Sequence, residues 1–100
     1  MTPEGKVKAR VRATLKKAGA YAFMPVQTGL GATTLDLLVC INGQFLAIET
    51  KAEKGQITPR QWVVADAIVA AGGWAIFVRG LDGAKEFEQW LLQYPEQTKH

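Results

Sequence analysis

Asp36, Glu49 and Lys51 are the ionisable residues whose spacing best suits a reactive site. Asp36 directly precedes an apolar segment at residues 37–41, and Glu49 and Lys51 lie at the end of another at residues 44–51; both segments have the composition of β-strands. Facing carboxylates repel each other, which raises the pKa of at least one of them. One interpretation is an edge ion-pair cluster in which the lysine offsets both acids. The other is a site where oxygen ligands hold a hard cation, Mg²⁺ or Mn²⁺, with the lysine beside the reacting group.

The register of the predicted hairpin brings these three residues together. Asn42-Gly43 is a strong signal for a two-residue turn, and such a turn makes paired positions sum to 85. Asp36 then lies opposite Glu49 as a non-hydrogen-bonded pair, with Cα atoms about 4.5 Å apart. Lys51 shares the face of Glu49, because side chains alternate along a strand. The rest of this face is apolar and consists of Leu38, Cys40, Phe45 and Ala47. We expect Cys40 to be a small core residue.

Three further polar residues each have an ordinary interpretation beside a functional one. Glu4 falls at the centre of the apolar stripe of the first predicted helix, so it is either a first-turn acid that interacts with the helix dipole or a further carboxylate of the site. Lys8 lies near the same stripe, and its ordinary role is to extend past apolar surface to solvent. Thr58-x-x-Gln61 is a capping box, which needs no function. Gln61 also begins the helix that follows the Glu49 strand, so it can equally face the site.

Helix end signals and apolar periodicity predict one domain over residues 1–100. A helix between the last two strands makes those strands parallel, because parallel neighbours need a crossover. The expected fold class is therefore α/β, a mixed β-sheet flanked by helices. In chain order we expect a helix from Thr2-Pro3 to a stop at Gly19, a weak edge strand at 21–27, a loop at 28–34, strands at 37–41 and 44–51, a helix at 59–71, a strand at 74–79 and a helix at about 83–93.

Charge is distributed unevenly along the chain. The sequence has 12 Lys and Arg against 9 Asp and Glu, a net charge of +3, yet residues 1–60 contain nine basic residues against four acidic ones. Six of the basic residues fall between Lys6 and Lys17. Such a segment either binds a polyanion or is the solvated face of a helix, and charge alone leaves both interpretations open.

Composition excludes several classes of protein. With 48% apolar and 21% charged residues, a chain of 100 residues is a globular domain and not a disordered segment. No apolar run approaches the roughly 20 residues of a membrane span, the N-terminus lacks the apolar stretch of a signal peptide, and the single cysteine excludes an internal disulfide. His100, the only histidine, is the last residue, which excludes histidine-based triads and zinc sites. We expect a cytoplasmic protein without a membrane partner.

The arrangement of these motifs resembles the PD-(D/E)xK nuclease superfamily, and more narrowly its VRR-NUC (virus-type replication-repair nuclease) group. The similarity covers residues 4–79 and depends on residues 31–39 with their aspartate, on residues 48–61 and on Gly-Gly-Trp-Ala at 72–75. In residues 48–61 an acid–lysine pair is followed by a glycine, a Thr-Pro and a glutamine. Leu35 stands where the family usually has a proline. The resemblance implies an αβββαβ restriction-endonuclease-like core, here with a C-terminal helix added.

The resemblance also implies a nuclease that depends on Mg²⁺ or Mn²⁺. Asp36, Glu49 and the backbone carbonyl of Thr50 would ligate the metal. Lys51 would position or activate the attacking water, or stabilise the pentavalent phosphorus. Glu4 would match the acid that some members supply from the first helix. Gln61 would match the glutamine that orients the site in this group.

Stand-alone VRR-NUC domains resemble Holliday junction resolvases, which act as homodimers, and they are often phage-encoded. The expected activity is therefore structure-selective DNA cleavage in repair, on four-way junctions or other branched DNA. A domain this small has no separate base-reading module, so backbone contacts should dominate. The candidate phosphate contacts are Lys6, Arg10, Arg12, Lys16, Lys17, Lys54 and Arg60.

Two other functions and two modes of assembly stay open. A non-catalytic nucleic-acid-binding relative is disfavoured by the complete acid–acid–lysine set, whereas a nuclease for RNA or flap DNA would use the same chemistry. The helix at 59–71 is apolar on nearly all sides, with Asp66 alone polar from residue 62 onward, so a second surface should cover it. Either a second copy of the chain or the last helix of the same chain could provide that cover.

Overall fold

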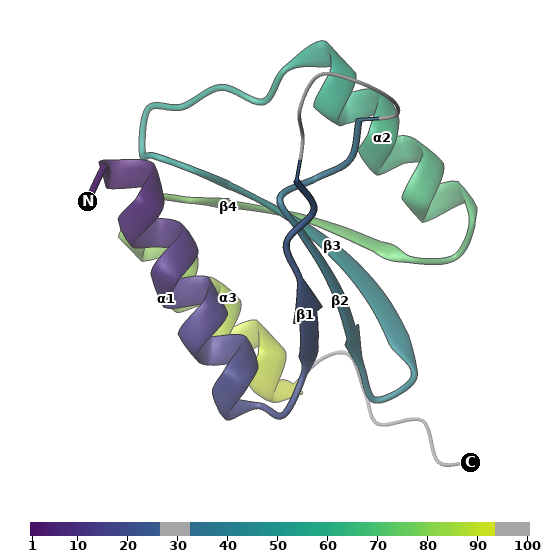
Figure 1. Cartoon of the computed structure of the whole chain (residues 1–100), viewed down its shortest axis with the longest axis horizontal. Helices are drawn as coiled ribbons and strands as arrows, with labels where there is room; N and C mark the ends of the chain where they lie inside the picture. Colours follow the sequence, from purple (N-terminus) through teal and green to yellow (C-terminus); the bar gives the residue numbers. More distant parts are fainter. Residues whose placement is uncertain (27–32, 94–100) are drawn as a thin grey trace.

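The computed structural model describes residues 1–26 and 33–93, and within these ranges it contains three helices and four strands in the expected order (Figure 1). The strands form one mixed sheet in the order β1-β2-β3-β4. β1 pairs with β2 and β2 with β3 in antiparallel fashion, and β3 pairs with β4 in parallel, as predicted. The elements are α1 (Pro3–Lys17), β1 (Tyr21–Phe23), β2 (Leu37–Ile41), β3 (Gln44–Lys51), α2 (Pro59–Ala70), β4 (Trp74–Arg79) and α3 (Gly80–Gln93).

The hairpin between β2 and β3 has the predicted register. Its pairs run from Ile41↔Gln44 to Leu37↔Ile48, so that every pair sums to 85. Asn42 and Gly43 both have positive φ, 51° and 77°. Two successive positive φ angles define the primed turn that a tight two-residue hairpin needs. The edge strand β1 is confirmed over Tyr21–Phe23 only, and most of the expected loop at 28–34 lies outside the described residues.

Two of the three helices begin at the expected caps, and the third begins earlier than predicted. The Thr2 hydroxyl accepts a hydrogen bond from Gly5 N at 3.0 Å, and the Thr58 hydroxyl accepts one from Gln61 N at 3.1 Å. α3 begins at Gly80, three residues before the expected 83. Gly80 has a φ of +69°, which lets the chain turn directly from β4 into the helix.

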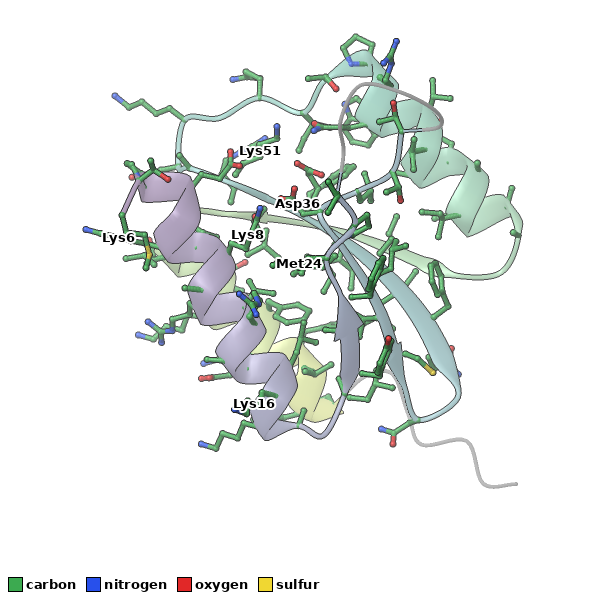
Figure 2. All side chains as sticks on the ribbon, viewed as in Figure 1. Lys6, Lys8, Lys16, Met24, Asp36 and Lys51 are labelled. Carbon is green, nitrogen blue, oxygen red and sulfur yellow. The ribbon has the colours of Figure 1, made fainter. Side chains whose placement is uncertain are left out.

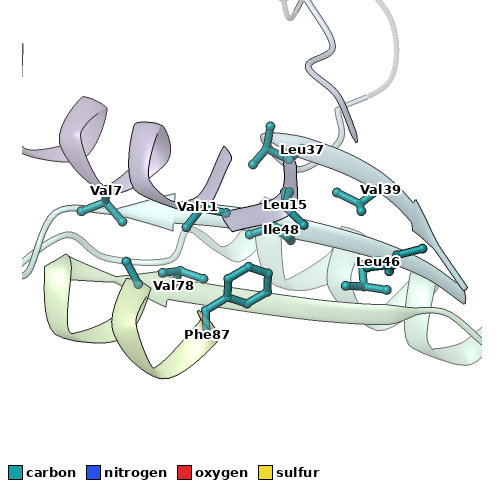
Figure 3. Packing of buried hydrophobic residues seen from close by; sticks show 11 residues of the cluster. Val7, Val11, Leu15, Leu37, Val39, Leu46, Ile48, Val78 and Phe87 are labelled. Carbon is teal, nitrogen blue, oxygen red and sulfur yellow. The ribbon is translucent and has the colours of Figure 1, made fainter. Parts of the chain in front are cut away.

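The hydrophobic core lies on one face of the sheet, under α1 and α3. Figure 1 shows these two helices side by side, with α2 on the other side of the sheet. The side chains in this core come from both helices and from three strands, as Figure 3 shows. They are Val7, Val11, Leu15, Leu37, Val39, Ile41, Leu46, Ile48, Val78, Ala84 and Phe87.

The opposite face of the sheet is only partly covered, which corrects two expectations. Cys40 was expected in the core but is exposed, because it points to this face. α3 does not cover α2, since it packs against α1 and β4. Within α2 only Ala65 is buried, and Val63 and Val69 are 68% and 57% exposed. No helix in the described part of the chain is long and apolar enough to cross a membrane.

Candidate functional site

Asp36 and Glu49 meet at the open end of the β2–β3 hairpin, as the register predicted. The backbone N–H of Asp36 donates to Glu49 Oε1 at 3.2 Å. In return Asp36 Oδ2 accepts hydrogen bonds from Thr50 N at 3.2 Å and from the Thr50 hydroxyl at 2.9 Å. Each carboxylate is thus held by the backbone of the opposite strand. The strand residues fix the acids in place, and the Thr50 hydroxyl adds a contact that the sequence did not indicate.

Leu35 lies just before Asp36 and is fully buried. A proline at this position would restrict the backbone by its ring, whereas leucine anchors the segment by packing. The departure from the family pattern therefore leaves the aspartate held in position.

Two lysines from different elements approach the acids. Lys51 Nζ lies 3.7 Å from Glu49 Oε2, and this side chain is only 14% exposed. Lys8 Nζ lies 3.5 Å from Asp36 Oδ1. Figure 2 shows Lys8 reaching from α1 toward Asp36, with Lys51 above Asp36 in this view. Among the described residues each acid thus has a cationic neighbour, and the ammonium of Lys8, which was expected to extend past apolar surface to solvent, ends beside Asp36.

Gln61 fulfils both of its predicted roles at once. Its side-chain Oε1 accepts a hydrogen bond from Thr58 N at 3.0 Å, which completes the capping box of α2. Its Nε2 donates to Glu49 Oε2 at 3.0 Å. The start of α2 is therefore connected to the site by a single side chain, which holds Glu49 Oε2 on the side of Lys51.

The loop that follows Lys51 packs closely on it. A Cβ atom at Gly55 would lie 3.1 Å from Lys51 Cβ, tighter than most such contacts, so glycine favours this close approach. Arg79 Nε donates to Gly55 O at 3.1 Å and ties the loop to the end of β4. These contacts restrict the stem of Lys51 while its ammonium group faces Glu49.

Burial makes Glu49 an unusual acid. The residue is 3% exposed, and its pKa is raised from 4.5 to about 7. Burial is the largest cause and the charge of Asp36 the second, whereas Lys51 and the Asp36 N–H oppose the shift. The raised carboxylate pKa was expected from repulsion between the acids. Desolvation contributes more than repulsion does, because the Glu49 side chain is almost entirely shielded from solvent.

Glu4 lies at the margin of this site. It is half-buried, and its charge is the smallest of the influences that raise the Glu49 pKa. Within the described ranges no three His, Cys, Asp or Glu residues are grouped closely enough to hold a metal. The pair of carboxylates is therefore the acidic centre, and a ligand role for Glu4 stays a prediction.

The donor set of Asp36 and Glu49 fits a magnesium-like ion. Mg²⁺ uses one or two carboxylates and completes its octahedron with waters and substrate phosphates, so two acids suffice. Two adjacent carboxylates, one of them buried, also form a site whose repulsion a divalent cation would relieve. A soft-metal site would need cysteine or histidine ligands, and among residues 1–26 and 33–93 no three His, Cys, Asp or Glu side chains are grouped to form one. The Thr50 carbonyl as a third ligand stays a prediction.

The seven candidate phosphate contacts are all exposed, but those on α1 belong to two flanks. Arg12 and Lys16 follow Lys8 at intervals of four, which places them on the same side of the helix. They line a groove of about 520 Å³ between α1 and β1, opposite Met24. Figure 2 shows Lys6 on the other side of α1. We call the side of α1 that carries Lys8, Arg12 and Lys16 the groove flank.

The remaining basic residues lie elsewhere. Lys6 and Arg10 precede Lys8 and Arg12 by two positions, about 200° around the helix, and Lys17 is on their side. Lys6 lines a different cavity, next to Asp82 at the start of α3. Lys54 lies in the loop after β3, and Arg60, in the first turn of α2, donates to the Thr33 hydroxyl at 3.4 Å.

Comparison with known structures agrees with this architecture. A solved structure described as a VRR_NUC domain superposes with a TM-score of 0.75, and the match covers 95% of this chain and 100% of that one at 19% sequence identity. No protein-family model matches the sequence, and no curated protein does. The chain therefore has a restriction-endonuclease-like α/β fold, and specifically the fold of a VRR-NUC domain, as the sequence resemblance predicted.

Proposed function

We propose that this protein is a metal-dependent, structure-selective DNA endonuclease that hydrolyses phosphodiester bonds in four-way junctions or other branched DNA. The observation that carries the proposal is the pairing of Asp36 with Glu49, beside the ammonium of Lys51 at 3.7 Å from Glu49 Oε2. Two acids and a lysine held by strand backbone are the groups that phosphodiester hydrolysis with a divalent cation requires.

Each residue of the site has a distinct part in this reaction. Asp36 and Glu49 would hold Mg²⁺ or Mn²⁺, which when bound lowers the pKa of a coordinated water and polarises the phosphoryl group. The Lys51 ammonium, restricted by the packing of Gly55, stabilises the charge that develops on the phosphate. Gln61 keeps Glu49 oriented by its hydrogen bond at 3.0 Å.

The groove between α1 and β1 is the path we propose for the DNA backbone. Arg12 and Lys16 line this groove, and Lys8, one turn before Arg12 on the same side of α1, is bound to Asp36. Phosphates attracted to these cations would pass directly to the carboxylates. Contacts of this kind depend on the course of the backbone and not on base sequence, which supports selection by DNA structure.

The homodimer is supported by the uncovered face of the sheet. An apolar cavity of about 690 Å³ lies between α2 and the β2–β3 hairpin, with Phe45, Val63 and Ile68 among its lining. Contiguous apolar surface of this kind is typical of an interface, and a second copy can cover it by two-fold symmetry. We expect sedimentation at micromolar concentration to show twice the 10.9 kDa chain mass, and Val63→Asp to give the monomer. A wild-type protein that sediments only at the chain mass would contradict the dimer.

Cleavage of a substrate panel tests the proposed activity. The panel contains a four-way junction, a flap, nicked duplex, linear duplex and single strands, each as DNA and the single strand also as RNA, with Mg²⁺, Mn²⁺ or EDTA. We expect cleavage of branched DNA with either metal and none in EDTA. Undiminished cleavage in EDTA would contradict the metal-dependent mechanism. Binding of branched DNA without cleavage under any condition would identify a non-catalytic relative.

A further inference from the structure

A second cavity lies beside the carboxylates, on the side away from Asp36. It has a volume of about 250 Å³ and is lined by Lys51, Ile57, Trp62, Phe77, Val78 and Arg79. Because Lys51 also lies 3.7 Å from Glu49 Oε2, its side chain separates this cavity from the acids. A group bound in the cavity would therefore be next to the proposed reacting phosphate.

The sheet and α2 fix this position. In the parallel pairing of β3 with β4, Phe77 is the register partner of Glu49, and Arg79 is the partner of Lys51. Neighbouring strands lie about 4.8 Å apart, so the floor of the cavity is one strand away from the acids. Trp62 follows Gln61 in α2, and Gln61 donates to Glu49. Thus the wall of the cavity and the orientation of Glu49 depend on the same helical turn.

The walls are flat and apolar, and the rim is cationic. Trp62 meets Phe77 edge to face, with ring centroids 4.8 Å apart and an interplanar angle of 85°. Trp62 is nevertheless 51% exposed, so much of the indole surface remains accessible. Lys51 and Arg79 supply positive charge at the edge, and Arg79 is held there by its bond to Gly55 O.

We infer that this cavity receives one unstacked nucleobase of the nucleic-acid substrate, from a nucleotide next to the cleaved phosphate. The inference rests on the proposed nuclease function and adds a base-binding subsite to it. A volume of about 250 Å³ lies below the roughly 300–1,000 Å³ of pockets for drug-sized molecules, so it suits a group of one or two rings. A nucleobase, which is joined through its sugar to a phosphate, matches an aromatic wall with cations at its rim.

This subsite gives a physical reason for structure selectivity. A base inside an intact duplex must be unpaired and unstacked before it can reach Trp62, which requires several kcal/mol. Bases at the centre of a junction, at a flap or in a single strand need much less. Stacking on an aromatic side chain accepts all bases, so the subsite selects DNA that is locally open and not a base sequence.

Binding in EDTA tests the subsite without cleavage. The probe is a fluorescein-labelled single-stranded oligonucleotide, as DNA and as RNA, titrated with wild type, Trp62→Ala and Trp62→Phe. Trp74→Ala is the control, because it removes an indole that is 39% exposed at the opposite end of β4 from Arg79. We expect Trp62→Ala to weaken binding by roughly 5- to 150-fold, the range for stacking of one base. Trp62→Phe and Trp74→Ala should stay within about threefold of wild type.

Abasic substitution then locates the base. A series of branched substrates carries one abasic spacer at successive positions around the cut, and kcat/KM is measured for wild type and for Trp62→Ala. At one position the spacer should lower the kcat/KM of wild type by about the same factor as the Trp62→Ala substitution does on the intact substrate. In Trp62→Ala the same spacer should lower kcat/KM little further. A merely structural Trp62 would give the same spacer effect in both proteins and would overturn the subsite.

The wild-type series alone can also refute the inference, should Trp62→Ala fail to fold. If no spacer position lowers wild-type kcat/KM, no base near the cut is bound, and the subsite is wrong while the nuclease stands. Trp62-dependent binding without any cleavage would support the base subsite and contradict the proposed nuclease.

Discussion

The two faces of the sheet differ in how completely they are covered. On the face under α1 and α3, Leu37 and Leu46 are fully buried. On the face toward α2, Phe45 is 45% exposed and Cys40 is exposed as well. The same strands supply both sets of side chains, alternating residue by residue. Among the strand residues that the structure describes, Glu49 is the buried polar residue of this second face.

Because of this difference, one face of the sheet mainly stabilises the fold and the other carries the candidate site. The closed face supplies most of the apolar burial, and burial of apolar surface is the main favourable contribution to folding. The open face can therefore carry a buried acid with a raised pKa, which opposes folding when it is ionised. An exposed apolar surface beside it is available to a partner or a substrate. Variants on the two faces should accordingly change different measured quantities.

The largest expected effect is on activity and concerns the open face. Lys51→Ala removes the cation nearest Glu49 and should lower kcat/KM on branched DNA by roughly a hundredfold to a thousandfold. Its melting temperature should remain close to that of wild type. Lys85→Ala is the control, because it removes an exposed lysine of α3 that is not among the candidate phosphate contacts. Equal activity of Lys51→Ala and Lys85→Ala would refute a role for Lys51 in the reaction.

The next effect, on stability, compares the two faces directly. Leu15→Ala on the closed face should lower the free energy of unfolding by about 2–5 kcal/mol, because Leu15 is fully buried in the core. Phe45→Ala on the open face should lower it by about 1 kcal/mol, since nearly half of that side chain is already in solvent. Urea denaturation in the Val63→Asp background, which we expect to be monomeric, measures both. A loss at Phe45 as large as that at Leu15 would contradict the division between the faces.

A pH-dependent effect should come from Glu49. Its pKa is about 7 in the folded state and 4.5 in the reference state, so between these values the folded protein retains a proton that the unfolded chain releases. The free energy of unfolding should therefore fall as pH rises from 4.5 to 7, by about 3 kcal/mol in total. Glu49→Gln cannot ionise and should lack this decrease, so that at pH 8 it is at least as stable as wild type.

Glu53→Gln is the matched control for this profile, because Glu53 is exposed. Urea denaturation of the three proteins between pH 5 and 8 gives the comparison. Parallel profiles for wild type and Glu49→Gln would mean that Glu49 ionises at an ordinary pH in the folded protein.

The smallest effect distinguishes the two flanks of α1. Arg12→Ala should weaken binding of branched DNA several-fold and reduce the salt dependence of log K by about one unit, because one phosphate contact is lost. Arg10→Ala, on the other flank, removes the same charge from the same helix and should change both quantities less. Fluorescence anisotropy at several salt concentrations measures them. If both variants behave alike, the groove between α1 and β1 is not the path of the DNA.

Local rules were sufficient to predict much of the site. The Asn42-Gly43 turn set the register, and the period of two in a strand then placed Asp36 beside Glu49. The capping box likewise identified the start of α2, and one further step along the chain suggested that Gln61 faces the acids. Each inference needed only residues close in sequence or joined by a short turn.

What could not be predicted depends on packing between distant elements. Both faces of β2 are apolar, as Leu38 and Val39 show, so alternation could not tell which face the helices would close, and Cys40 was placed wrongly. The approach of Lys8 to Asp36 depends on the angle at which α1 crosses the sheet. That α3 would start at Gly80 and pack beside α1 also follows from tertiary contacts.

The metal response of the Asp36–Glu49 pair tests the central claim most directly. Melting of wild type and Asp36→Asn is followed at pH 8, where Glu49 is ionised, in EDTA and in Mn²⁺. In EDTA the variant should melt at the wild-type temperature or slightly above it, because repulsion is removed while the asparagine oxygen can still accept from Thr50. Mn²⁺ at a hundredfold excess over Kd should stabilise wild type by about 2.7 kcal/mol and the variant far less. A clear drop in the variant's melting temperature in EDTA, with no metal effect on either protein, would show a structural ion-pair cluster and contradict the metal site.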